Sequence, residues 1–331
     1  MFRRFFNYLI RNQVLLALFI IALGWFVIQL RDIIVSIFLS YIIMASVLPM
    51  VNFLRKKGFP KIFAVLIPYL GIITAIFLLI LPLVPFVISQ IQSLITRFPH
   101  FLDDSTTNFG FAINPQQLET YLNSEFNNLG HNAINVTTQV FGGLFSVITI
   151  FVVSFYLLMY NDSFKKGFSK LFQRENRTYV LEVIDRVNDK LGAWLRGQAI
   201  LCLSIGLFSW VGLTLLGIPY ALPLALMAGL LEVIPTIGPI LSAVPAAIIA
   251  LTVSPTLMLA VISLYILIQA LENQILVPKI MERAVGLNPV FVILGVMIGA
   301  NIMGVAGALL AIPFISFIIV IFNSIEQRQE N

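Results

Sequence analysis

Long apolar runs alternate along this chain with short polar stretches that carry nearly all of its charged residues. A charge-free apolar run of about 18 or more residues is long enough for a helix to cross the hydrocarbon core of a bilayer. The pattern predicts eight apolar segments, at Val14–Leu30, Ile33–Leu54, Ile62–Ile88, Leu144–Tyr160, Gln198–Gly217, Ala221–Thr252, Thr256–Val277 and Val290–Phe322.

The predicted fold class is an all-α polytopic membrane protein. In lipid only helices and closed barrels satisfy their own backbone hydrogen bonds, and these runs are too long for barrel strands. Composition agrees, because 59% of the 331 residues are hydrophobic and only 11% are charged, against about 25% charged in soluble domains. The lipid bilayer is therefore the expected surrounding. No nucleic-acid partner is expected, because most basic residues lie in short loops.

The polar stretches divide the chain into five parts. These are an N-terminal three-helix membrane region (1–88), an extracytoplasmic polar insert (89–143), a fourth transmembrane helix (144–160), a cytoplasmic amphipathic segment (161–197) and a motif-rich transport region (198–331). Cytoplasmic loops are enriched in Lys and Arg, and this rule places both termini in the cytoplasm.

An amphipathic helix is predicted inside the cytoplasmic segment. Val187, Leu191 and Trp194 recur there at helical spacing, with charged residues on the opposite face. This helix either lies on the membrane surface or packs against the protein's own helices, and the pattern leaves both alternatives open.

Two segments, 221–252 and 290–322, are much longer than the about 20 residues that one span needs. Each is interrupted near its middle, the first at Ile234-Pro235-Thr236-Ile237-Gly238-Pro239 and the second between Gly299 and Gly307. Each segment is either a long kinked span or a re-entrant hairpin. The basic residues Lys279 and Arg283 favour hairpins, because hairpins keep their loop in the cytoplasm.

Glu232 and Glu272 are the only charged residues between Arg196 and Lys279. A carboxylate in hydrocarbon costs about 2.5 kcal/mol or more, so such a group faces a cavity, pairs with a cation or binds a proton. Pairing with Lys279 or Arg283 is the alternative for Glu272. Glu232 has no basic residue near it in sequence, which favours an interior role.

Enzyme motifs are missing from the sequence. It contains no Walker loop, no His-Glu-x-x-His, no Gly-x-Ser-x-Gly and no cysteine pair, since Cys202 is the single cysteine. We therefore expect no enzymatic activity, no ATP hydrolysis, no cofactor and no metal site.

The motifs of the C-terminal half resemble those of the autoinducer-2 exporter (AI-2E) family of bacterial membrane proteins. The resemblance rests on Arg196-Gly197-Gln198, Gly217-Ile-Pro219-Tyr-Ala221, Ile234-Pro235-Thr-Ile-Gly238-Pro239, Gln269-x-x-Glu272-Asn273, Val285-Gly286-Leu287-x-Pro289 and Gly304-x-x-Gly307-x-x-x-Ala311-x-Pro313. The layout of apolar segments is also similar across nearly the whole chain.

This resemblance implies a multi-pass transporter of the bacterial inner membrane, assembled as a homo-oligomer, a pentamer. Family members are associated with export of the furanosyl signal autoinducer-2, and others with sodium or lithium exchange for protons. The candidate pathway residues are Glu232, Pro235, Thr236, Gly238, Pro239, Gln269, Glu272, Asn273, Asn301, Gly304 and Gly307.

Three functions follow as hypotheses. The first is a secondary transporter that moves a small polar solute by alternating access, with its site at the interrupted segments. The second is exchange of a monovalent cation, Na⁺ or Li⁺, for protons through the intramembrane carboxylates. The third is a membrane scaffold that transports nothing and binds partners through its polar segments.

Overall fold

The computed structural model describes residues 13–80, 133–234, 237–281 and 289–329. All regular secondary structure in these ranges is helical, which confirms the predicted all-α fold. Pro235, Thr236 and Arg283, and the part of the predicted insert before residue 133, lie outside the described residues.

The helices follow the predicted apolar segments closely. The first group is α2 (Gln13–Gln29), α3 (Arg31–Lys56), the helix Lys61–Ile80, α6 (Ala133–Met159) and α7 (Asn161–Ser169). The second is η1 (Arg174–Asn176), α8 (Arg177–Leu215), α9 (Ala221–Leu231), α10 (Ile237–Leu251), α11 (Pro255–Leu271), the π-helix η2 (Glu272–Leu276), α12 (Val277–Met281) and α13 (Pro289–Gln329).

Five of the described helices are long and apolar enough to cross a membrane, or six if residues 145–159 and α7 form one bent span. Each of the eight predicted segments contains helix within the described residues. With 17 residues, α2 is slightly shorter than a full span, and the 221–252 segment consists of two shorter helices, α9 and α10.

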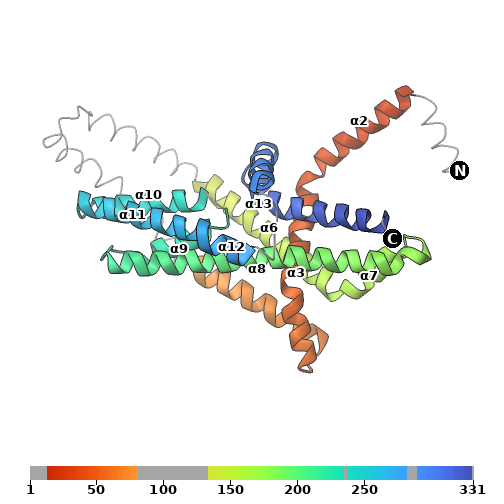
Figure 1. Ribbon diagram of the computed structural model, residues 1–331, viewed down its shortest axis with the longest axis horizontal. Helices are drawn as coiled ribbons and strands as arrows, with labels where there is room; N and C mark the ends of the chain where they lie inside the picture. The colour runs from red at the N-terminus through yellow and green to blue at the C-terminus, as the bar shows by residue number, and fades with distance from the viewer. Residues whose placement is uncertain (1–12, 81–132, 235–236, 282–288, 330–331) are drawn as a thin grey trace.

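Helix α8 extends along most of the molecule and contacts helices at both of its ends (Figure 1). Its 39 residues correspond to a length of about 58 Å. The helix passes without a break through the predicted boundary between residues 197 and 198, because no proline interrupts this stretch. The cytoplasmic segment and the transport region therefore share one helix.

The N-terminal half of α8 packs against the protein itself. Val187, Leu191 and Trp194 are buried in one cluster with Ile42 of α3 and Leu310 of α13. Of the two alternatives left open for this amphipathic helix, packing against the protein's own helices is the one observed.

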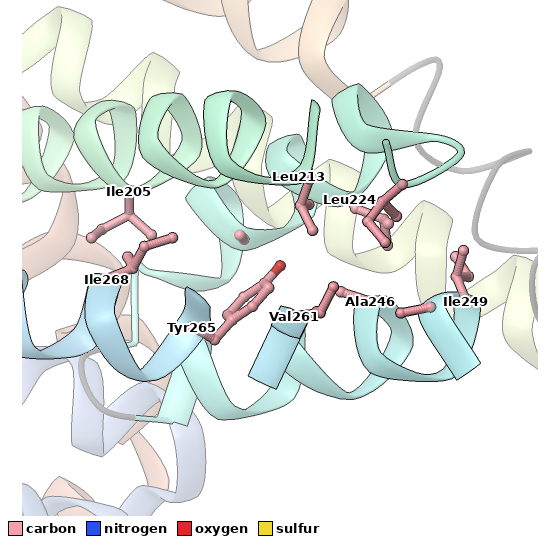
Figure 2. Packing of buried hydrophobic residues seen from close by; sticks show 11 residues of the cluster. Ile205, Leu213, Leu224, Ala246, Ile249, Val261, Tyr265 and Ile268 are labelled. Carbon is pink, nitrogen blue, oxygen red and sulfur yellow. The ribbon is translucent and has the colours of Figure 1, made fainter. Parts of the chain in front are cut away.

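The C-terminal half of α8 packs with α9, α10 and α11. Figure 2 shows Ile205 and Leu213 of α8 pointing toward Ile268 and Val261 of α11. This bundle forms the largest buried apolar cluster among the described residues, and the acidic residues described below lie at the C-terminal ends of its helices α9 and α11.

Helix α13 folds back on itself at Met303 and Gly304. Gly304 has φ 60° and ψ −141°, a conformation open to glycine. A Cβ on Gly307 would lie 2.0 Å from the carbonyl oxygen of Gly299, whereas a straight helix would separate these residues by about 12 Å. The interruption predicted between Gly299 and Gly307 is therefore the tip of a helical hairpin.

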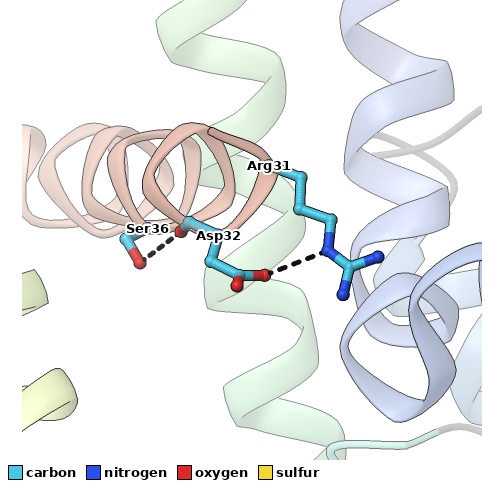
Figure 3. Close-up of polar contacts among 3 residues, drawn as sticks. All are labelled: Arg31, Asp32 and Ser36. Atoms are coloured by element: carbon cyan, nitrogen blue, oxygen red, sulfur yellow. Dashed lines mark hydrogen bonds and ion pairs between the residues drawn. The ribbon is translucent and has the colours of Figure 1, made fainter. Parts of the chain in front are cut away.

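The junction between the first two helices carries an exposed ion pair. Arg31 Nε lies 3.6 Å from Asp32 Oδ1, and the Ser36 hydroxyl donates to the Asp32 carbonyl (Figure 3). An exposed pair of this kind contributes at most about 1 kcal/mol. Its main effect is to place polar side chains between two apolar segments, as the sequence pattern predicts.

We predict that Gly307→Ala destabilises the protein by about 1–3 kcal/mol, because the new Cβ meets backbone that moves only if the hairpin opens. Thermal unfolding in detergent measures this change. Gly71→Ala is the matched control, since nothing lies within 4 Å of the Cβ position of Gly71. Equal unfolding temperatures for the two variants would contradict the tight contact between the two arms of α13.

Candidate functional site

The candidate site forms where α9 ends inside the bundle. Helix α9 stops at Leu231, and Glu232 is its C-terminal cap. The chain turns within a few residues, because the N–H of Gly238 donates to the carbonyl of Ile234 and starts α10. A Cβ on Gly238 would lie 2.1 Å from the Leu231 carbonyl oxygen, so glycine is needed for this close approach. Helices α9 and α10 pack together as a hairpin.

Glu232 is completely buried at this turn. Its backbone carbonyl accepts a hydrogen bond from the side-chain amide of Gln198 at 2.8 Å. Neither oxygen of its carboxyl group has a hydrogen-bond partner of good geometry within the described part of the chain. The interruption of the helix is thus stabilised by α8, while the carboxyl group itself has no hydrogen-bond partner in the described part of the chain.

Glu272 is also buried, at 2% exposure. It begins the π-helix η2, and its Oε2 accepts a hydrogen bond from the Gln269 amide at 3.1 Å. Pro278 follows η2 and has no N–H for the carbonyl of Gln274, which explains the local widening of the helix. Such π-turns inside helices occur frequently at functional sites.

The two carboxyl groups lie within electrostatic range of each other, although no hydrogen bond of good geometry joins them in the described structure. No basic side chain of the described residues forms an ion pair with either, and all the ion pairs found in these ranges involve exposed acids. The predicted alternative of a Glu272–Lys279 pair is therefore not observed. Two buried carboxyl groups without a counter-charge are stable only if they hold a proton or a cation.

Further polar side chains continue from this pair along the interior of the bundle. Cys202 of α8 lies beside Gln198 and within electrostatic range of both carboxyl groups. Farther along the bundle, the Tyr265 hydroxyl points into the interior in Figure 2 and lies near Ser209 and Ser242, without a hydrogen bond of good geometry in the described structure.

Sequence reasoning missed this inner group, although the spacing contains a signal. Tyr265 and Gln269 of α11 and Glu272 at its C-terminal cap follow one face at steps of four and three residues, and Gln198, Cys202 and Ser209 follow one face of α8 at steps of four and seven. Because these stripes lie inside apolar helices, polar residues at that spacing indicate a common interior surface.

The other predicted site residues differ in burial and position. Gly238 and Pro239 are buried at the start of α10, while Asn273 is exposed. Asn301 and Gly304 are exposed at the tip of the α13 hairpin. Helix α13 packs mainly on α8 and shares no extensive contact with α9, α10 or α11. The structure therefore gathers Glu232, Glu272 and Gln269, but does not bring the second hairpin tip against them.

The comparisons with known proteins identify the family. The model of AI-2E family transporters matches residues 14–327, nearly the whole chain. The chain belongs to the AI-2E transporter family. Membership makes it a multi-pass membrane protein of a transporter family, as the resemblance in the sequence predicted.

Relatives of this AI-2E family chain align over most of their length. The candidate transport protein YrrI of Bacillus subtilis is 29% identical over 305 residues, which cover 87% of this chain and 85% of YrrI. YueF of the same organism, also a candidate transport protein, is 26% identical over 94% of this chain and 90% of YueF. The AI-2 transport protein TqsA of Escherichia coli is 25% identical over 89% of this chain and 88% of TqsA.

We predict that Gln198→Leu destabilises the protein by about 1–3 kcal/mol, because the buried carbonyl of Glu232 loses its hydrogen bond. The midpoint of thermal unfolding in detergent measures this loss. Ser204→Ala is the control on the same helix, since that exposed hydroxyl bonds only the Ile200 carbonyl. Equal midpoints for the two variants would show that the Gln198 contact does not support the turn.

Proposed function

We propose that this AI-2E family chain is a secondary transporter that exports a small polar solute by alternating access, without ATP hydrolysis. The observation that carries the proposal is the buried Glu232–Glu272 pair, which has no basic partner in the described structure and lies at an interrupted helix of a membrane protein. Buried ionisable groups at such interruptions are typical of transport pathways.

The lengths of α9 and α10 support this mechanism. With 11 and 15 residues, they reach only about 16 and 22 Å, less than the about 30 Å of the hydrocarbon core. A hairpin of this size ends inside the membrane, where only protein or a watery cavity can receive its turn. Movement of the hairpin against α8 and α11 would expose the acidic pair to either side in turn.

The polar groups around the pair favour a solute rich in hydroxyl groups. Carboxyl groups accept hydrogen bonds from hydroxyls, and the amide of Gln269 both donates and accepts them. The relative TqsA is named as an AI-2 transport protein, and a cargo of this furanosyl class suits the same groups.

A second candidate function is exchange of Na⁺ or Li⁺ for protons. It is favoured by the same carboxyl pair, because two acidic groups without a counter-ion bind either a proton or a small cation through their oxygens. In this mechanism the cation and the proton compete for the pair, and no organic solute is required.

Membrane orientation and assembly complete the proposal. We propose the bacterial inner membrane, with both termini in the cytoplasm, because the exposed Arg55, Lys56 and Lys57 end α3 on the cytoplasmic side under the positive-inside rule. The predicted insert 89–143 is then extracytoplasmic, and 161–197 is cytoplasmic. The family resemblance supports a homo-oligomer, a pentamer.

We predict that Glu232→Gln and Glu272→Gln each lower transport by reconstituted protein to below about a tenth of the wild-type rate, with little loss of stability. Proteoliposomes are assayed with a panel of small polar metabolites, and with an internal pH dye under Na⁺ or Li⁺ gradients. Glu182→Gln, an acid-to-amide change at an exposed site, is the matched control.

The outcome separates the candidate functions. Solute uptake without a cation requirement supports the exporter, and proton flux driven by Na⁺ or Li⁺ supports the exchanger. Transport that persists in both variants would overturn the role of the carboxyl pair. Complete absence of transport in wild-type protein would leave the scaffold hypothesis.

We predict that cysteines replacing Lys166 and Lys279 in a Cys202→Ala background are not labelled by an impermeant maleimide in intact cells. They become labelled after the membrane is permeabilised, because both positions are expected in the cytoplasm. A cysteine replacing Ser105, in the predicted external insert, is the positive control. Labelling at position 279 in intact cells would contradict the re-entrant arrangement.

A further inference from the structure

A sharp elbow joins α6 to α7. The axes of residues 145–159 and of α7 differ by 71° across a break at Tyr160. The elbow, defined here as residues 153–172, plays no part in the acidic site described above.

The elbow carries a row of exposed aromatic side chains at steps of four residues. The row consists of Tyr156, Tyr160, Phe164, Phe168 and Phe172. Tyr156 stacks on Tyr160, and Phe164 stacks on Phe168. Tyr160 and Phe164 line one groove across the bend, and Phe168 contacts Phe172, so this row forms a continuous apolar strip around the elbow.

An apolar groove lies on the inner side of this strip. Its volume is about 310 Å³, and it is lined by Val153, Tyr156, Leu157, Tyr160 and Phe164. The lining contains no charged residue, and its only polar side-chain atoms are the two tyrosine hydroxyls. These properties suit a hydrocarbon chain.

Basic residues lie on α7 and at its C-terminal cap. Lys165 turns inward and pairs with Asp185 of α8, while Asp162 pairs with Lys61. These two ion pairs fix α7 against its neighbours. Lys166 of α7 and Lys170 at its C-terminal cap are exposed, and neither forms an ion pair within the described ranges.

We propose that the elbow binds an anionic phospholipid. One acyl chain occupies the groove, and Lys166 and Lys170 bind the headgroup phosphate. Phe164 of α7 lines the groove, and Lys166 and Lys170 follow it within six residues. Apolar and basic groups therefore adjoin along the chain, as the acyl chain and the phosphate do in a lipid. Aromatic rings and lysines at such a position are characteristic of a membrane interface, where lysine stems extend to reach phosphate groups.

Native mass spectrometry of delipidated protein tests this site, with dioleoyl-phosphatidylglycerol as the probe and dioleoyl-phosphatidylcholine as the neutral lipid. We expect wild-type protein to retain phosphatidylglycerol preferentially. Lys166→Gln/Lys170→Gln should weaken its binding about fivefold and leave phosphatidylcholine unchanged. Lys56→Gln/Lys57→Gln removes the same charge from the end of α3 and should have little effect.

A second variant tests the groove separately. Leu157→Trp fills it and should reduce binding of both lipids, while the unfolding temperature shows that the protein remains folded. Soluble glycerol phosphate should not compete, because it has no acyl chain. The proposal is overturned if both lysine pairs weaken binding equally, if neither does, or if Leu157→Trp changes the oligomeric state instead of lipid retention.

Discussion

The arrangement of this molecule depends on burying two carboxyl groups in an apolar bundle without a basic partner among the described residues. Such groups are costly in hydrocarbon, so the surrounding structure must hold them in place. Gln198 satisfies the carbonyl at the end of α9, Gln269 bonds Glu272, and the π-turn places Glu272 in the interior. Apolar packing of α8 to α11 supplies the rest of the stability. The acidic pair is therefore held by one hydrogen bond to the Glu232 backbone, by one to the Glu272 carboxyl group, and by the apolar packing of the bundle.

Much of this site could be predicted from the sequence because charge is so sparse. Two acids inside apolar segments are conspicuous, and the interruption next to Glu232 is visible as Pro235, Gly238 and Pro239. The tip of the α13 hairpin was predicted for the same reason, since glycines interrupt an over-long segment. These features depend on local composition, which one sequence displays directly.

Features that depend on packing could not be predicted. The sequence gives no register between α9 and α11, so it does not show that Glu232 and Glu272 face each other. For the same reason the distance of Asn301 and Gly304 from the pair was not foreseen. The continuity of α8 through residue 197 was not predicted. Charged residues become rare after that point, which suggested a boundary, whereas no proline interrupts the helix there. The elbow at α7 was not predicted, because a stretch that contains several lysines is equally typical of a simple cytoplasmic loop.

The unbroken length of α8 has a mechanical consequence. A helix of 39 residues without proline behaves as a stiff rod, with α3, α7 and α13 attached along one half and the α9–α11 bundle along the other. In the proposed transport mechanism the α9–α10 hairpin moves relative to this helix. The hydrogen bond between Gln198 and Glu232 joins the two. Movement of the hairpin away from α8 therefore breaks that bond.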